Sequence, residues 1–304
     1  VTKQYPDGTV AVDDLSLTAP DRAITVLVGP SGCGKTTTLR MINRMIEPTS
    51  GTLTVDGKDV TKVDAVKLRL GIGYVIQSAG LMPHLRVIDN VATVPVLRGE
   101  SRRSARRSAL GVLERVGLDP KLADRYPAQL SGGQQQRVGV ARALAADPPI
   151  LLMDEAYSAL DPLIRYDMQT VLLDLQKEVR KTIVFITHDL DEALRIGDRI
   201  ALLRDGSVIQ QGTGQDIVLN PADDYVANFV QHVDRGKVLR VEAVMDAPAG
   251  SPMAGITIRA DASLAEALKL MAANQTQGLL VQGGAGQVVG WLPFRAAIEA
   301  QAGR

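Results

Sequence analysis

One eight-residue pattern constrains this sequence more than any other feature. It matches G-x-x-x-x-G-K-[ST] and reads Gly29-Pro30-Ser31-Gly32-Cys33-Gly34-Lys35-Thr36. An apolar strand pattern, 24–28, precedes it, and a helical pattern with Leu39, Ile42 and Ile46 on one face follows it. A glycine-rich turn in this position directs backbone N–H groups toward a phosphate at a helix N-terminus. The context therefore favours a phosphate-binding loop over an ordinary glycine-rich turn.

The phosphate loop, 29–36, also supplies side chains for nucleotide chemistry. Lys35 can reach the β- and γ-phosphates of a nucleotide, and Thr36 can ligate Mg²⁺. A second motif, Met153-Asp154-Glu155, ends an apolar run. Asp154 then emerges at the carboxyl edge of a sheet, where a carboxylate can hold Mg²⁺. The adjacent Glu155 either polarises an attacking water or is simply solvated.

Alternating strand and helix patterns predict an α/β fold. Apolar strands at 150–153 and 183–186 flank a helix at about 163–179, as in a parallel sheet with buried strands. Hairpin signals at 5–8 and 55–58 predict an antiparallel β layer. The pattern is helical from about 87 to 117, and its basic stretch is interpreted as a solvated helix face, without a function.

Composition excludes several classes of function. The 34 basic residues balance 34 acidic ones, so no overall field would hold the chain on nucleic acid or on an anionic membrane. The apolar runs are far shorter than the roughly 20 residues that span a bilayer, so any membrane attachment should come through a protein partner. The single cysteine, Cys33, excludes an internal disulfide and suits a reducing cytosol. The chain starts at Val1 without a signal pattern, and we expect it to begin inside the native protein.

The segment 130–134, Leu-Ser-Gly-Gly-Gln, resembles the signature sequence of ABC ATPases. Other residues match that family's elements, and they occur in the family's order along the chain. Tyr5 is similar to the aromatic residue that stacks on adenine, and Gln77 to the glutamine of the Q-loop. The segment 158–161 resembles the D-loop, and His188 resembles the switch histidine. The resemblance covers 1–230. It implies a P-loop NTPase of ABC type, with a parallel sheet core, an antiparallel β layer and a helical subdomain at about 87–145.

The resemblance also implies a set of site residues. The catalytic residues would be Glu155, His188, Lys35 and Gln77, and the Mg²⁺ ligands Thr36, Gln77 and Asp154. ATP would be bound by the side chains and backbone of Tyr5, Gly29, Pro30, Ser31, Gly32, Cys33, Gly34, Lys35, Thr36, Thr37, Ser131, Gly132, Gly133, Gln134 and Asp161.

The same resemblance implies partners. Two copies would pair head to tail, each signature capping the γ-phosphate of ATP held by the other copy. The homodimer would lie at the cytoplasmic face of the cell membrane as a peripheral subunit. It would bind integral membrane permease subunits through 77–91 and serve a solute-binding protein indirectly, with no nucleic acid.

Two stretches narrow the substrate. The segments 77–84 and 153–165 resemble importers of glycine betaine, proline betaine, carnitine or choline. Ala156 stands where most ABC ATPases have proline, and Tyr157 where this osmoprotectant branch usually has phenylalanine. An importer of another small solute, such as an amino acid, remains an alternative. A non-transport ABC ATPase acting on nucleic acid or ribosomes is disfavoured, because the chain has one phosphate loop and no heptad run between 77 and 131.

The end of the chain predicts a second, smaller unit. We expect the ATPase domain to span 1–245, followed by a linker at 246–255 and a β-α-β-β-α unit at 256–304. This α+β tail resembles a single CBS motif. The stretch 291–297 lacks the aspartate that usually contacts ribose in that family. Dimer contact or a degenerate regulatory role is therefore expected rather than ligand binding.

Overall fold

The computed structural model describes residues 1–248 and 255–303. The chain divides into two compact units, Val1–Gln211 and a second that begins at Gly212. The first unit is built on a six-stranded sheet in the order β10-β9-β3-β8-β7-β6. These strands are β3 (Ile24–Val28), β6 (Ile72–Val75), β7 (Ile150–Asp154), β8 (Thr182–Thr187), β9 (Arg199–Arg204) and β10 (Ser207–Gly212). The pairs β3/β8, β3/β9, β7/β8 and β6/β7 are parallel, which confirms the predicted parallel core.

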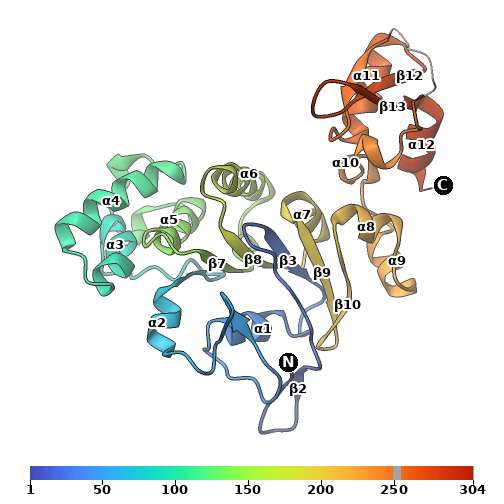
Figure 1. Ribbon diagram of the computed structural model, residues 1–304. Coiled ribbons are helices and arrows are strands. Elements are labelled where there is room, and N and C mark those ends of the chain that lie inside the picture. The colour runs from blue at the N-terminus through green and yellow to red at the C-terminus, as the bar shows by residue number, and fades with distance from the viewer. Residues whose placement is uncertain (249–254, 304) are drawn as a thin grey trace. The chain divides into compact units, whose positions relative to one another are not determined.

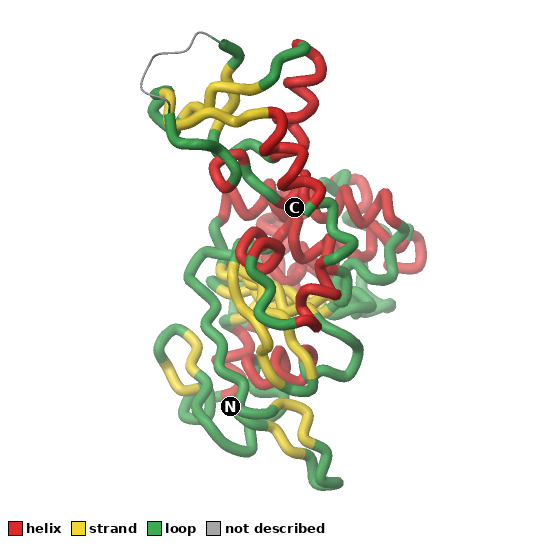
Figure 2. The backbone as a smooth tube through the Cα atoms, turned by 90° about the vertical axis from the view of Figure 1, so that its right-hand side faces the viewer, coloured by secondary structure: helices red, strands yellow, loops and turns green. Residues whose placement is uncertain are grey.

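The central strands form because their residues are apolar on both faces. Every residue of β3 is buried, and β7 and β8 are buried apart from their first residues. Strands of this kind need helices on both sides. In Figure 1, α6 (Pro162–Val179) and α7 (Leu190–Ile196) lie above the sheet, and α1 (Lys35–Ile42) lies below it. Figure 2 shows the strands crossing the middle of this unit between helices.

Three helices form the predicted helical subdomain at one end of the sheet (Figure 1). They are α3 (Val87–Leu97), α4 (Arg102–Arg115) and α5 (Gly132–Leu144), and they pack on one another. Two short 3₁₀ helices, η1 (Pro120–Leu122) and η2 (Pro127–Gln129), connect α4 to α5. The helical pattern predicted from 87 to 117 is interrupted, because α3 ends before Gly99, which has a φ of +97°. Ser101 then caps α4 by accepting from the Ser104 N–H.

Both predicted hairpins are present in the first unit. Strands β1 (Lys3–Gln4) and β2 (Val10–Val12) pair antiparallel, as do β4 (Thr54–Val55) and β5 (Lys58–Asp59). They form two separate two-stranded sheets, so the predicted antiparallel layer is not one continuous sheet. The short helix α2 (Ala65–Leu70) then leads into β6.

The second unit begins earlier than predicted. Its first elements are α8 (Gly214–Leu219), α9 (Asp224–Val230), α10 (Arg235–Val238) and η3 (Val241–Ala243). α10 packs against the tail helices, and the Val241 N–H donates to the Ala262 carbonyl. The compact units therefore divide near Gly212 rather than between 245 and 246, because the residues before 246 already pack into the tail.

The tail has the predicted β-α-β-β-α order. Its elements are β11 (Thr257–Arg259), α11 (Leu264–Asn274), β12 (Gly278–Gln282), β13 (Val288–Pro293) and α12 (Phe294–Ala302). β12 pairs parallel with β11 and antiparallel with β13. Within the predicted linker 246–255, Asp246 forms a β-bridge with Trp291, and 249–254 lie outside the described residues. Among the described helices, none has the length and apolar character needed to cross a membrane.

Candidate functional site

The phosphate loop connects β3 to α1, where the sequence pattern placed it. Gly34 precedes α1 with a φ of +95°, and a Cβ there would lie 2.3 Å from the Ala11 carbonyl oxygen. A Cβ at Gly29 would lie 2.2 Å from the Leu203 carbonyl oxygen. Both glycines are therefore required by close backbone neighbours, one from β2 and one from β9. The Lys35 ammonium lies inside the loop and donates to the carbonyls of Gly29 and Pro30, at 2.7 and 2.9 Å.

Two predicted Mg²⁺ ligands meet at the end of β7. The Thr36 hydroxyl donates to Asp154 Oδ1 at 3.0 Å, joining the first turn of α1 to the carboxyl end of β7. Tyr74 on β6 donates its hydroxyl to Asp154 Oδ2 at 3.4 Å. Burial raises the pKa of Asp154 above its ordinary value, and the Thr36 hydrogen bond acts in the opposite direction. A buried carboxylate of this kind is suited to a neighbouring cation.

A second group of predicted residues surrounds Glu155. Its Oε2 lies 3.5 Å from His188 Nδ1 and 3.4 Å from the Gln77 amide nitrogen. The same amide nitrogen lies 3.2 Å from Ser158 Oγ. Three chain segments, following β6, β7 and β8, thus bring one side chain each to the same place. Glu155 itself has a φ of +44°, in the left-handed region that non-glycine residues rarely adopt.

The segment after Glu155 is fixed to the segment that carries His188. Asp161 caps α6 by accepting from the N–H groups of Leu163 and Ile164, each at 3.1 Å. On α6, Arg165 donates to the carbonyls of Ser158 and Leu160 and forms an ion pair with Asp189 at 3.4 Å. The observed role of the Asp161 carboxylate is thus to cap a helix of its own chain.

The signature segment 130–134 forms the N-terminus of α5. Ser131 Oγ accepts from the Gln134 N–H at 3.3 Å, and Gln134 Oε1 accepts from the Ser131 N–H at 3.0 Å. This capping box leaves the N–H groups of the first turn at the positive end of a 13-residue helix. A Cβ at Gly133 would lie 2.8 Å from Ile164 Cγ2, so the signature is packed against the start of α6. Its described hydrogen bonds do not join it to the phosphate loop of the same chain.

Tyr5 lies in the turn between β1 and β2. Its N–H donates to the Thr9 carbonyl, and its carbonyl accepts from the Gly8 N–H. The Lys3 ammonium lies 5.4 Å from the centre of its ring. The hairpin is anchored beside the phosphate loop, because the Ala11 carbonyl on β2 is the close neighbour of Gly34.

The sequence interpretation missed three residues that complete these groups. Tyr74 contacts Asp154, Ser158 contacts Gln77, and Arg165 links the Glu155 segment to Asp189. Ser158 and Arg165 lie within the segments 158–161 and 153–165, whose resemblance to the family could have indicated them. Tyr74 lies on a four-residue strand that the sequence patterns did not indicate. Among the described residues, no cluster of three or more His, Cys, Asp or Glu side chains is placed to hold a metal ion.

These features define a P-loop nucleotide-hydrolysing protein: a phosphate loop before α1, the Asp154 carboxylate at the end of β7, and Glu155 and His188 beside it. Comparisons with known proteins agree. A family model described as ABC transporter matches residues 12–158. The choline transport ATP-binding protein OpuBA of Bacillus subtilis is 44% identical over 286 residues, which cover 92% of this chain and 74% of that protein.

Two further comparisons extend the match. The trimethylamine N-oxide transport system ATP-binding protein TmoW of Ruegeria pomeroyi is 45% identical over 298 residues, covering 96% of this chain and 86% of that protein. A dimeric structure of the ATP-binding cassette MJ0796 bound to ADP and Pi is 36% identical, with a TM-score of 0.64, and covers 70% of this chain and 96% of that one. This chain belongs to the ATP-binding proteins of ABC transporters. It binds ATP and is an ATPase.

Proposed function

We propose that this chain powers an importer of small solutes that carry a trimethylated nitrogen. The observation that carries the substrate class is the set of relatives. OpuBA is named for choline and TmoW for trimethylamine N-oxide, and the OpuCA protein of Bacillus subtilis, 43% identical over 285 residues, is named for glycine betaine, carnitine and choline. These molecules differ in charge and in their other groups, but all have three methyl groups on one nitrogen. An amino-acid importer remains the second candidate from the sequence, and none of the relatives reported above is named for amino-acid transport.

The residues of the first unit support a division of labour in ATP binding. Tyr5 stacks on the adenine from its hairpin beside the phosphate loop. The backbone N–H groups of the loop from Ser31 to Thr37 cradle the phosphates at the N-terminus of α1. Lys35, already directed into the loop by its bonds to Gly29 and Pro30, moves its ammonium to the β- and γ-phosphates.

The oxygen atoms near Asp154 fit a magnesium ion. A hydroxyl from Thr36 and a buried carboxylate lie 3.0 Å apart, and both are the hard oxygen ligands that Mg²⁺ prefers. Thr36 and Asp154 would hold the ion, with the Gln77 side-chain oxygen as a further ligand. When bound, Mg²⁺ neutralises charge that develops on the phosphate oxygens. Asp154 and Thr36 also fix the relative positions of β7 and α1 through their own hydrogen bond.

We assign Glu155 to the attacking water. It accepts a proton from the water or orients it, and His188, 3.5 Å away, contacts the γ-phosphate and holds the carboxylate in place. The Gln77 amide nitrogen contacts the Glu155 carboxylate and is also within hydrogen-bond distance of Ser158 Oγ. The backbone at Glu155 is left-handed, and its carboxylate lies beside Gln77 and His188.

The signature acts on a second copy. Two chains close head to tail, so that Ser131 Oγ and the N–H groups of Gly132 and Gly133 meet the γ-phosphate of ATP bound by the partner. Gln134 supports this site by holding Ser131 in the capping box. The free positive end of α5 supports this role. Asp161 lies at the same closing face, at the start of α6.

The transport partners follow from the same proposal. The segment 77–91 contacts the integral membrane permease, which holds the homodimer at the cytoplasmic face of the membrane and receives solute from a binding protein. The ATPase domain and the CBS-like tail act as separate units. The tail contributes a dimer contact or a degenerate regulatory surface rather than a nucleotide site.

The test of the ATPase mechanism uses Glu155→Gln, which keeps the shape of the side chain and removes its charge. ATP binding and closure should survive, while hydrolysis slows by the roughly 10²–10⁴-fold that is typical of losing a general base. Size-exclusion chromatography with MgATP should then show an accumulated dimer. Adding Ser131→Arg should abolish that dimer, because a bulky cation fills the space for the partner's γ-phosphate. Hydrolysis at the parent rate, or a dimer indifferent to Ser131→Arg, contradicts the mechanism.

The substrate class is tested with the chain and its permease together in proteoliposomes. Glycine betaine, choline, carnitine and trimethylamine N-oxide should stimulate ATP hydrolysis in the presence of the binding protein, and an amino acid without methylated nitrogen should not. Glu155→Gln in the same complex is the control, because a complex that cannot hydrolyse ATP should show no stimulation by any of these solutes. Stimulation by the amino acid alone would identify the alternative solute class.

A further inference from the structure

The loop between β6 and α3, residues 76–86, is fixed almost entirely by the helical subdomain. We call it the Gln77 loop. Its second half is held by Asn90 on α3, which is fully buried. The Asn90 amide donates to the carbonyls of Met82, Leu85 and Arg86, and its oxygen accepts from the Met82 N–H at 2.7 Å.

The first half of the loop is held by Arg142, near the end of α5. Its two terminal nitrogens donate to the carbonyls of Gly80 and Ala79, at 2.6 and 2.8 Å. A planar guanidinium can bind two adjacent carbonyls at once, which a lysine ammonium cannot do with the same geometry. Gly139, one turn earlier on α5, lies against Ala79, because a Cβ there would be 3.3–3.4 Å from Ala79 atoms.

The backbone under this fork is in an unusual conformation. Ala79 has a φ of +56° and Gly80 a φ of +55°, so two successive residues are left-handed. Ala79 is also buried. A non-glycine residue in that region persists only where its surroundings fix it. The Arg142 fork and the Gly139 contact are the surroundings that fix it here.

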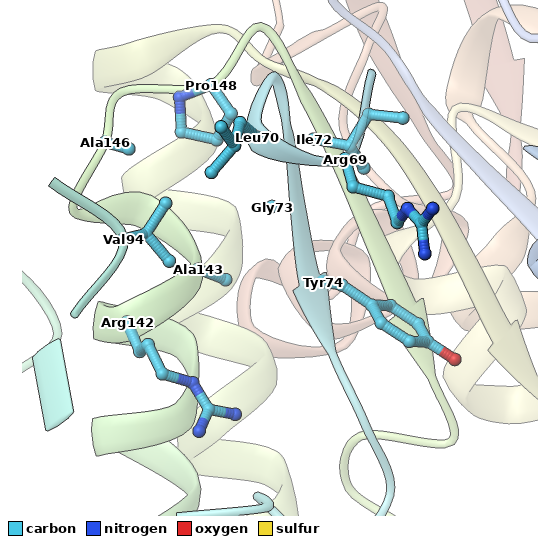
Figure 3. Close-up of a pocket in the computed structure, with 10 residues that line it drawn as sticks. All are labelled: Arg69, Leu70, Ile72, Gly73, Tyr74, Val94, Arg142, Ala143, Ala146 and Pro148. Carbon is cyan, nitrogen blue, oxygen red and sulfur yellow. The ribbon is translucent and has the colours of Figure 1, made fainter. Parts of the chain in front are cut away.

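A cavity of about 180 Å³ lies beside Arg142 at the junction of α5 with β6. In Figure 3, Val94, Ala143 and Arg142 lie on one side of Gly73, and Arg69 and Tyr74 lie on the other. The helix α5 and the edge strand β6 approach closely at Gly73, where a Cβ would lie 2.5 Å from the Ala143 carbonyl oxygen, and the cavity lies beside this contact. Arg142 lines this cavity and directs its fork to the Gln77 loop.

We propose that Arg142 is a positioning residue for ATP hydrolysis. Its fork fixes the Gln77 loop to the signature helix α5 and so holds the backbone next to Gln77 in the conformation that keeps the Gln77 amide beside Glu155. Gln77 lies two residues before Ala79, and its amide nitrogen is 3.4 Å from Glu155 Oε2. The inference rests on the proposed role of Gln77, and it assigns Arg142 no contact with the nucleotide.

Kinetics of three single variants test the proposal. Arg142→Ala should lower kcat by roughly tenfold, the effect expected when hydrogen bonds from a charged donor are lost, with little change in KM for MgATP. Arg142→Lys should recover part of kcat, because one donor is restored. Arg98→Ala is the matched control: Arg98 also donates from the helical subdomain to a backbone carbonyl, that of Ala146, but does not touch the Gln77 loop. It should retain the parent kcat.

Hydrogen exchange separates positioning from a general loss of structure. In Arg142→Ala, amides of 77–82 should exchange roughly tenfold faster, while those of α5 keep their protection. Because this readout needs no hydrolysis, it stands even if Glu155→Gln contradicts the proposed mechanism. Unchanged exchange in the loop, or equal loss of protection throughout α5, overturns the proposal.

A double-variant cycle tests whether Arg142 acts through Gln77. If it does, Arg142→Ala combined with Gln77→Ala should be no slower than Gln77→Ala alone, because the positioned group is already absent. Effects that multiply independently would overturn the proposal.

Discussion

Gly34→Ala, compared with Gly32→Ala, offers a matched test of why the phosphate loop has its glycines. The two positions have similar φ values, +95° and +84°, so an alanine at either is strained by about 1–3 kcal/mol. Only Gly34 also has a close neighbour. Its Cβ would lie 2.3 Å from the Ala11 carbonyl oxygen, whereas a Cβ at Gly32 has nothing within 4 Å.

The added contact should cost Gly34→Ala about 1–3 kcal/mol of unfolding free energy beyond Gly32→Ala, the range for forced overpacking. We would measure this in urea without nucleotide by circular dichroism. The only tryptophan, Trp291, lies in the second unit, so its fluorescence does not report on the first. Equal costs for the two variants would refute the reasoning, because the Ala11 contact would then contribute nothing.

Two further predictions follow from other parts of the fold. Burial raises the pKa of Glu192 above 4.5, so the folded state keeps this proton to a higher pH than the unfolded state. The free energy of unfolding should therefore fall as pH rises from about 4.5 through the raised pKa. Glu192→Gln should flatten this part of a pH–stability curve, and an unchanged slope would contradict the prediction. Deleting 213–304 should leave a protein that hydrolyses ATP at close to the basal rate. Deleting only 246–304 should expose Leu239 and Val241, which are fully buried in the full chain, and should therefore increase binding of a hydrophobic dye. Equal dye binding by the two truncations would contradict the observed boundary.

Much of the core could be predicted because its signals are local. The phosphate loop lies between a strand and a helix whose patterns are complete within a few residues. The strands β7 and β8 are built on the continuous apolar runs 150–153 and 183–186, which a buried parallel strand requires. The tail elements likewise follow short apolar patterns separated by glycine turns. In each case the residues that define an element are neighbours in the sequence.

The features that could not be predicted depend on distant residues. β6 has only four residues, and its Gly73 allows α5 to approach, since a Cβ there would lie 2.5 Å from the Ala143 carbonyl oxygen. Tyr74 then meets Asp154, a partner 80 residues later. The division near Gly212 depends on residues 235–246 packing into the tail, although their sequence resembles that of a connecting segment. The predicted boundary at 245/246 rested on proline and glycine content, which does not report such contacts.

The left-handed backbone at Glu155 has a consequence for how this chain can change under mutation. A glycine at 155 would relieve about 1–2 kcal/mol of backbone strain while removing the carboxylate beside His188. If Glu155 has the role proposed above, stability and turnover thus favour different residues at one position. If a copy of the gene is no longer selected for hydrolysis, Glu155→Gly is therefore a single substitution that makes the protein more stable and leaves the phosphate loop intact. On the proposed mechanism, its product would bind ATP and close on a second copy without reopening.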